Sequence, residues 1–154
     1  MPTPPISASH SGEFGPACQA AHRYDDLVRT QRYDEIASLF APDPVWFMPT
    51  GTVARGRDEI GRSFQSYLGD RRPIFRTDNY VDDGLFCVME VSMKVRIDVD
   101  GKVALGVDGM AVIIPEGSTE DGVFVRRAID HFTVNEQGLI TRMIVYNAPT
   151  SYWL

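Results

Sequence analysis

Two aspartates lie inside strand-like runs of the sequence, where a carboxylate can point into the protein. Asp130 interrupts the half-apolar run "AIDHFTV", and Asp108 lies in "GVDGMAV". If the turn between the runs is centred near Thr119, the two aspartates pair directly across antiparallel strands, with Cβ atoms about 5 Å apart. Two carboxyl groups that close push their pKa values apart, which yields one acid and one base.

Each aspartate also has a simpler interpretation. Asp130 can face water, although Phe132 lies on the same side of the strand and is not a typical surface residue. Gly106 and Gly109 around Asp108 can mark a bulge or bend without chemistry. A register slip of one residue on one strand would send the two carboxyl groups to opposite faces. The acid–base pair is therefore a hypothesis that depends on the register.

Large apolar side chains predict the lining of a pocket, although each of them could equally be plain core. Asn147 ends the last strand on the same side as Met143 and Val145, where an amide could orient a ligand. The predicted lining residues are Trp46, Met48, Phe64, Phe132 and Met143.

Helices in the first half of the chain and strands in the second half must position these residues. Apolar residues recur with helical spacing over 15–30, 31–40 and 56–70, and a short strand fits 45–49. From about Pro73 the apolar period changes to two. Strands are predicted at 75–81, 85–97, 103–115, 123–134 and 139–147. Helices followed by an antiparallel meander are typical of an α+β fold.

Composition excludes several classes of partner. The net charge of −6 and the absence of a dense basic cluster argue against nucleic-acid binding. No apolar run approaches the roughly 18 residues of a membrane span. Three histidines without metal-ligand spacing predict no metal site. Two cysteines without a CxxC motif favour a reducing compartment.

The first fifteen residues, "MPTPPISASHSGEFG", are rich in Pro, Ser and Gly and lack the pattern of a signal peptide. We expect a flexible arm over 1–15, a single domain over 16–154 and a cytoplasmic location.

Three strings resemble the SnoaL-like and ketosteroid-isomerase-like family of the NTF2-like superfamily. They are "HRYDDLVRTQRYDEIASLFAPDPVWFMP", "GTVARGRDEI" and "AIDHFTVNEQGLITRM", in this order. The resemblance implies an NTF2-like cone, in which N-terminal helices pack in a strongly curved antiparallel sheet around a deep, mostly apolar pocket. It also implies a homodimer formed through the outer face of the sheet.

The resemblance also implies roles for single residues. Asp130 matches the oxyanion-hole aspartic acid of ketosteroid isomerase, and Tyr24 matches its tyrosine, although Tyr24 could also be a core residue. An apolar site keeps such an aspartic acid protonated, so that it can donate a hydrogen bond to the oxygen on which charge develops. One position departs from the family: Met48 occupies the place of the acidic general base, and a thioether cannot abstract a proton.

The sequence therefore predicts a small acid–base enzyme that needs no cofactor and is of the isomerase, dehydratase or cyclase type. Its substrate would be an apolar, ring-containing small molecule bound by Tyr24 and Asp130, with Asp108, water or the substrate itself supplying the missing base. The alternative is a non-catalytic NTF2-like protein that binds a hydrophobic ligand or serves as the partner subunit of a larger enzyme. Met48 favours that alternative.

Overall fold

The computed structural model describes residues 14–48, 51–69, 74–96, 103–105, 111–113 and 123–147. Asp108 and most of the predicted N-terminal arm lie outside these residues, and so does the side chain of Asn147. The helical elements are α1 (Pro16–Arg29), the 3₁₀ helix η1 (Tyr33–Leu39) and α2 (Arg57–Gly69). The strands are β1 (Phe40–Phe47), β2 (Val53–Arg55), β3 (Ile74–Asp83), β4 (Phe86–Arg96), β5 (Val103–Leu105), β6 (Ala111–Ile113), β7 (Val123–Val134) and β8 (Ile140–Asn147).

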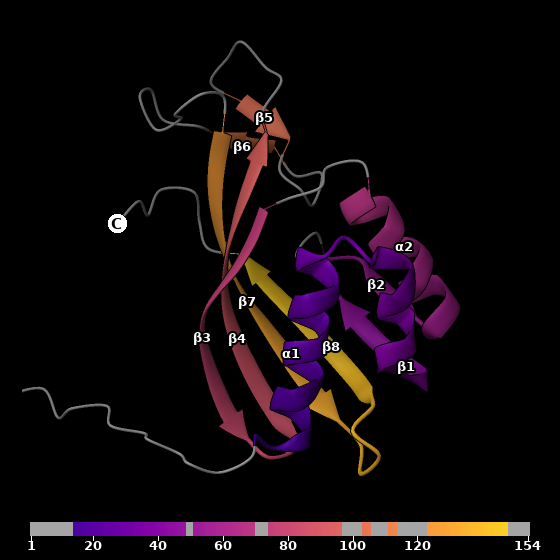
Figure 1. The fold of residues 1–154 in the computed structure, drawn as a ribbon. Coiled ribbons are helices and arrows are strands. Elements are labelled where there is room, and N and C mark those ends of the chain that lie inside the picture. The colour runs from indigo at the N-terminus through magenta and orange to yellow at the C-terminus, as the bar shows by residue number, and fades with distance from the viewer. Residues whose placement is uncertain are drawn as a thin grey trace, which may run out of the picture.

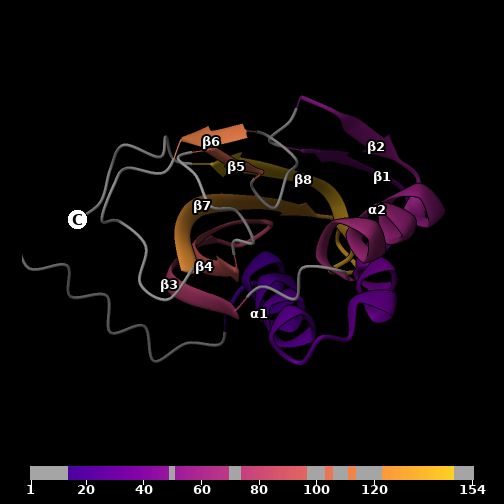
Figure 2. The ribbon, with the colours of Figure 1, turned by 90° about the horizontal axis from the view of Figure 1, so that it is seen from above.

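A curved sheet of six strands wraps around the helices (Figures 1 and 2). Its strand order is β2-β1-β8-β7-β4-β3, and α1 and α2 lie on its concave side (Figure 2). The predicted α+β class is thus confirmed. One feature differs from the prediction, because β1 pairs in parallel with β8 and the sheet is mixed. Strand β1 follows η1 directly and lies in the sheet beside β8, the last strand of the meander.

Helix α1 forms where the sequence predicted it. Pro16 lies in its first turn, where the missing N–H costs nothing. Ala17, Ala20 and Ala21 are fully buried, and these small side chains let the helix approach the sheet closely. Tyr24 lies one turn further along the same buried side. The second predicted helix is a 3₁₀ helix instead of an α-helix.

Strand β1 begins earlier than predicted, at Phe40, and runs through Pro42 and Pro44. Proline cannot donate a ladder hydrogen bond, and the pairing with β8 shifts between Phe40 and Val45, where both prolines lie. The short strand β2, which was not predicted, pairs with β1 from Val45 to Phe47.

The prediction of one long strand over 103–115 is wrong. Strands β5 and β6 from this segment pair with each other, with Val103 opposite Ile113. Strand β4 pairs directly with β7, from Phe86 opposite Thr133 to Arg96 opposite Val123. Strands β5 and β6 form a separate two-stranded sheet (Figure 1).

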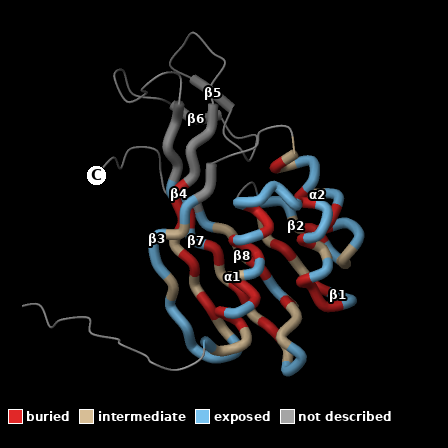
Figure 3. The backbone as a smooth tube through the Cα atoms, in the orientation of Figure 1, coloured by how far each residue is buried: buried red, intermediate tan, exposed pale blue. Residues whose placement is uncertain are grey.

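The core lies between the concave side of the sheet and the helices (Figure 3). Its fully buried large side chains include Trp46, Phe64, Phe132, Met89 and Met143. No helix in the described part of the chain is long and apolar enough to cross a membrane. The cytoplasmic location stays a prediction.

Candidate functional site

Three of the predicted lining residues form one row across the concave face of the sheet. Trp46 on β1 is paired with Met143 on β8, and Met143 is paired with Phe132 on β7. All three are almost completely buried. Phe64 reaches this row from α2 and lies flat against Trp46, with ring centroids 4.0 Å apart and planes 5° from parallel. These four predicted residues are therefore brought together.

Asp130 occupies the next inward-facing position on β7, beside this row. Its neighbours in the sheet are Met89 on β4 and Val145 on β8, and its exposure is only 3%. Burial raises the pKa of its carboxyl group from 3.8 to about 7. Such a carboxyl group exists in both protonation states near neutral pH.

Tyr24 approaches the same region from α1. Its ring contacts Phe64 and Phe132, with centroid distances of 5.7 Å and 5.4 Å. Burial, and after it the charge of Asp130, raise the pKa of the Tyr24 hydroxyl well above its usual value. The tyrosine therefore keeps its proton throughout the neutral range and can act as a hydrogen-bond donor.

Two further tyrosines belong to this environment and were missed as site residues. The charges of Tyr67 on α2 and Tyr33 on η1 also contribute to the raised pKa of Tyr24. The ring of Tyr67 stands edge-on to Trp46, with centroids 6.0 Å apart. Both tyrosines lie on the apolar sides of their segments, a spacing that is typical of core residues. The sequence signal that could have identified them is a tyrosine, which carries a hydroxyl group, at a position whose spacing predicts burial.

Met48 follows β1 directly, is half-buried and packs against the core. The residue at the position of the family's acidic general base is thus a methionine. The predicted pairing of Asp108 with Asp130 is wrong, because Met89 and Val145 occupy the positions on both sides of Asp130. Asn147 is paired with Ala128 through its backbone.

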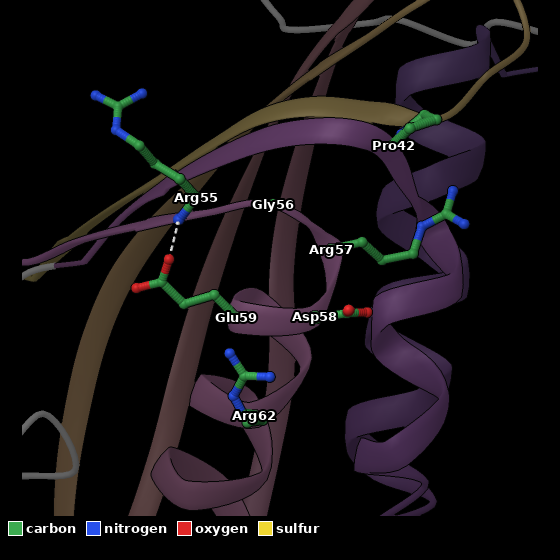
Figure 4. A pocket seen from close by; sticks show the side chains of 7 residues that line it. All are labelled: Pro42, Arg55, Gly56, Arg57, Asp58, Glu59 and Arg62. Carbon is green, nitrogen blue, oxygen red and sulfur yellow. Dashed lines mark hydrogen bonds between the residues drawn. The ribbon is translucent and has the colours of Figure 1, made fainter.

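A separate surface pocket of about 510 Å³ lies at the start of α2 (Figure 4). The charged groups of Arg57 and Glu59 in this pocket make hydrogen bonds within the fold. The Arg57 guanidinium donates two hydrogen bonds to the Phe40 carbonyl oxygen, at 3.1 Å and 2.6 Å. The Glu59 carboxylate accepts a hydrogen bond from the Arg55 backbone N–H at 3.0 Å (Figure 4). This pocket therefore shows how "GTVARGRDEI" fixes the start of α2, and it lacks the buried chemistry of the Asp130 region.

No group of three or more His, Cys, Asp and Glu side chains gathers closely enough to hold a metal ion in the part of the chain that the structure describes. The chemistry available at the site is therefore built from one buried carboxyl group, the tyrosine hydroxyls and the aromatic row.

Comparison with known proteins identifies relatives of this fold. The family model of the SnoaL-like domain matches residues 21–143. No curated protein matches the chain. A Mycobacterium tuberculosis protein solved in complex with estradiol-17beta-hemisuccinate is 18% identical, with a TM-score of 0.61 over 86% of this chain and 93% of that one.

Two enzymes are similar in structure. An LEH-like epoxide hydrolase of Mycobacterium tuberculosis is 14% identical, with a TM-score of 0.62 over 89% of this chain and 86% of that one. The epoxide hydrolase/cyclase-like enzyme SalBIII, which takes part in pyran ring formation in salinomycin, is 16% identical. Its TM-score is 0.61 over 85% of this chain and 89% of that one. At these identities the likeness shows the fold, and the NTF2-like cone predicted from the sequence is confirmed.

Proposed function

Because the chain belongs to the SnoaL-like family, we propose that it is a small acid–base enzyme of the isomerase, dehydratase or cyclase type. It needs no cofactor, and its substrate is an apolar, ring-containing small molecule. The observation that carries the proposal is the buried Asp130 carboxyl group, with a pKa raised to about 7, beside the protonated Tyr24. The relatives include an epoxide hydrolase, a cyclase-like enzyme and a protein solved with a steroid ligand, which supports this class of chemistry.

Asp130 can serve as both base and acid, which removes the need for a second carboxylate at Met48. In the carboxylate form, it takes a proton from the carbon next to a substrate carbonyl, and an enolate forms. The Tyr24 hydroxyl donates a hydrogen bond to the enolate oxygen as charge develops there. The resulting carboxylic acid then returns the proton to another carbon, which completes an isomerisation. In a dehydration it gives the proton to a departing hydroxyl group, which leaves as water.

A pKa near the working pH is what this double role requires. A general base is most effective when it is mostly deprotonated and still basic enough to hold the proton that it removes. An ordinary surface aspartate, with a pKa near 3.8, would be too weak a base at neutral pH. Burial among Met89, Val145 and Phe132 supports the raised value.

The second candidate is a non-catalytic ligand-binding protein or the partner subunit of a larger enzyme. Met48 favours it, because the family's usual base position carries no titratable group. The aromatic row would bind the ligand in either case. The two candidates differ in whether Asp130 transfers protons to and from a bound molecule. Turnover and binding must therefore be measured separately.

The test uses two series of apolar fused-ring ketones. Isomerisation is tested with ketones whose carbon–carbon double bond can move into conjugation with the carbonyl group, and dehydration with ketones that carry a β-hydroxyl group. Purified protein is assayed for isomerisation and dehydration, and ligand binding is followed by tryptophan fluorescence. We expect Asp130→Asn to lose turnover while it still binds, and Tyr24→Phe to lose part of the turnover. Asp83→Asn makes the same chemical change on an exposed strand end and should match the wild type. Binding without turnover by the wild type would favour the second candidate.

We also propose that two copies of the chain pair through the outer face of the sheet. One row of mostly apolar residues crosses all six strands there through paired positions. The row consists of Val53, Phe47, Ile144, His131, Val88 and Val81. In the adjacent row, Ile129 and Tyr146 are paired and 44% and 56% exposed. A second copy related by a two-fold axis presents the same surface and can cover these side chains.

A further inference from the structure

The two cysteines of the chain lie far apart in the sequence and contact each other in the fold. Cys18 is on α1 and Cys87 is on β4, and neither residue has exposed surface. Both are free thiols, and their side chains are in hydrogen-bonding contact. Because these are the only cysteines in the sequence, each thiol has a single possible partner in its own chain.

Contacts beside the two cysteines hold the start of α1 against the turn that leads into β4. The Ala17 N–H donates a hydrogen bond to the Gly84 carbonyl oxygen at 3.0 Å. The Gly15 N–H donates one to the Asp82 carboxylate at 2.7 Å. A Cβ atom at Gly15 would come within 2.8 Å of the Gly84 Cα atom, so the helix begins in close contact with this turn (Figure 1). The position of the two thiols is therefore fixed by neighbouring backbone.

Small side chains allow the close approach that a disulfide needs. Ala17, Ala20 and Ala21 surround Cys18 on the buried side of α1 and have no exposed surface. The Cβ atoms of a disulfide lie about 3.5–4.5 Å apart, which only closely packed elements provide. The sulfur atoms already contact each other, and side-chain rotation closes the remaining gap to a bond of about 2.05 Å.

We propose that Cys18 and Cys87 are a redox modification site, at which a low-molecular-weight disulfide oxidises them to an intramolecular disulfide that joins α1 to β4. One cysteine attacks the oxidant as its thiolate, forms a mixed disulfide and releases one small thiol. The other cysteine then attacks the protein sulfur of the mixed disulfide, which forms the cross-link and releases the second small thiol. Two protein thiols are oxidised, the small disulfide is reduced to two thiols, and the two protons leave with them.

Burial controls the rate of this reaction. It raises the pKa of both thiols, so they stay protonated at neutral pH in the closed structure. The thiolate is the reactive form. The first step therefore proceeds when the start of α1 separates from the turn between β3 and β4. Brief oxidation leaves the thiols intact, and sustained oxidation joins them.

The cross-link stabilises the fold and holds the helix that carries Tyr24. It closes a loop of about 70 residues, which restricts the unfolded chain strongly. Cys87 is paired with Phe132, whose ring contacts Tyr24 with centroids 5.4 Å apart. The oxidised protein thus keeps α1 beside Phe132. This chemistry is independent of the proposed function.

The experiment measures the disulfide at equilibrium in buffers of reduced and oxidised glutathione. Wild-type protein is incubated over a series of ratios, folded in one set and unfolded in concentrated urea in the other. Free thiols are then alkylated, and mass spectrometry of the digest identifies the peptide that links Cys18 to Cys87. We expect the folded protein to form the link at ratios about a hundredfold more reducing, because the fold holds the two sulfur atoms together. The oxidised protein should melt roughly 5–10 °C higher than the reduced protein.

Cys18→Ala and Cys87→Ala are the matched controls, because each keeps one thiol and cannot form the link. Oxidised glutathione should leave their melting temperatures unchanged, and a reductant should return the oxidised wild type to its original value. A folded wild type that forms no link, or forms it no more readily than in urea, would overturn the inference, and this comparison needs no variant. A melting temperature that falls on oxidation, or rises equally in the single-cysteine variants, would overturn it as well.

Discussion

Asp130 on β7 and Tyr24 on α1 lie close enough inside the protein for their charges to interact. After burial, the charge of Asp130 is the next largest cause of the raised pKa of Tyr24. Asp130 is itself buried with a pKa raised to about 7. The Asp130 charge thus helps Tyr24 to keep its proton. The raised pKa of Asp130 itself makes the stability of the folded state depend on pH.

The first prediction concerns the stability of Asp130→Asn. An acid whose pKa is raised by folding binds its proton more tightly in the folded state, so stability is present at low pH and falls as pH rises from about 4 to about 7. The shift corresponds to a cost on the order of 4 kcal/mol above pH 7. Asn cannot ionise, so the variant should be more stable than the wild type at pH 8 and should lose the fall in stability that Asp130 causes between pH 5 and 8.

Urea unfolding at pH 5 and pH 8 measures this difference. Asp83→Asn, on an exposed strand end, is the matched control and should keep the wild-type pH dependence. A wild type whose stability does not fall over this range would contradict the raised pKa of Asp130.

The second prediction concerns the pH dependence of catalysis. If Asp130 is the base, kcat/KM for a fused-ring ketone should rise with pH, with a midpoint near 7, and level off above it. Tyr24 stays protonated over this range because its pKa is raised, so no second step should appear below pH 9. Rates measured at half-unit intervals in buffers of constant ionic strength give the profile. A flat profile from pH 5 to 9 would assign the proton transfer to another group.

The sequence predicted which side chains of the site face inward, because this orientation follows from the residue spacing within each strand or helix. The alternation in "AIDHFTV" places Asp130 and Phe132 on one face, and both are buried on the concave side. Helical spacing likewise placed Tyr24 and Phe64 on the buried sides of their helices. Each of these positions depends only on the period of its own element.

Pairing between distant segments could not be predicted in the same way. The hypothesis that Asp108 is opposite Asp130 assumed that consecutive strands pair, whereas β4 pairs with β7 and bypasses the segment between them. The parallel contact of β1 with β8 joins the two ends of the domain, and no local pattern encodes it. The surroundings of Trp46 also depend on such contacts, because its pairing with Met143 and its stack on Phe64 exist only after folding.

The third prediction tests the outer face of the sheet. Ile129→Lys places a charge at the centre of the exposed pair with Tyr146 and should convert a homodimer to monomers, because a buried unpaired charge is strongly unfavourable. Light scattering after size-exclusion chromatography gives the mass directly. Leu85→Lys makes a similar change at the turn between β3 and β4, where the side chain is 47% exposed, and should leave the dimer intact. A wild type that is monomeric at high micromolar concentration would refute the dimer.

The fourth prediction concerns Arg57, which links the start of α2 to the start of β1. Its guanidinium donates two hydrogen bonds to the carbonyl oxygen of Phe40, a residue with no exposed surface. Arg57→Ala leaves that acceptor buried without either donor, which should lower the free energy of unfolding by about 1–3 kcal/mol. Arg62→Ala, in the same pocket but exposed, should change it by less than about 0.5 kcal/mol. Phe64 on α2 packs against Trp46, so Arg57→Ala should also weaken ligand binding. Chemical denaturation measures the loss of stability, and parallel ligand titrations measure the loss of binding. Equal stability losses in the two variants would show that the Phe40 carbonyl does not depend on Arg57.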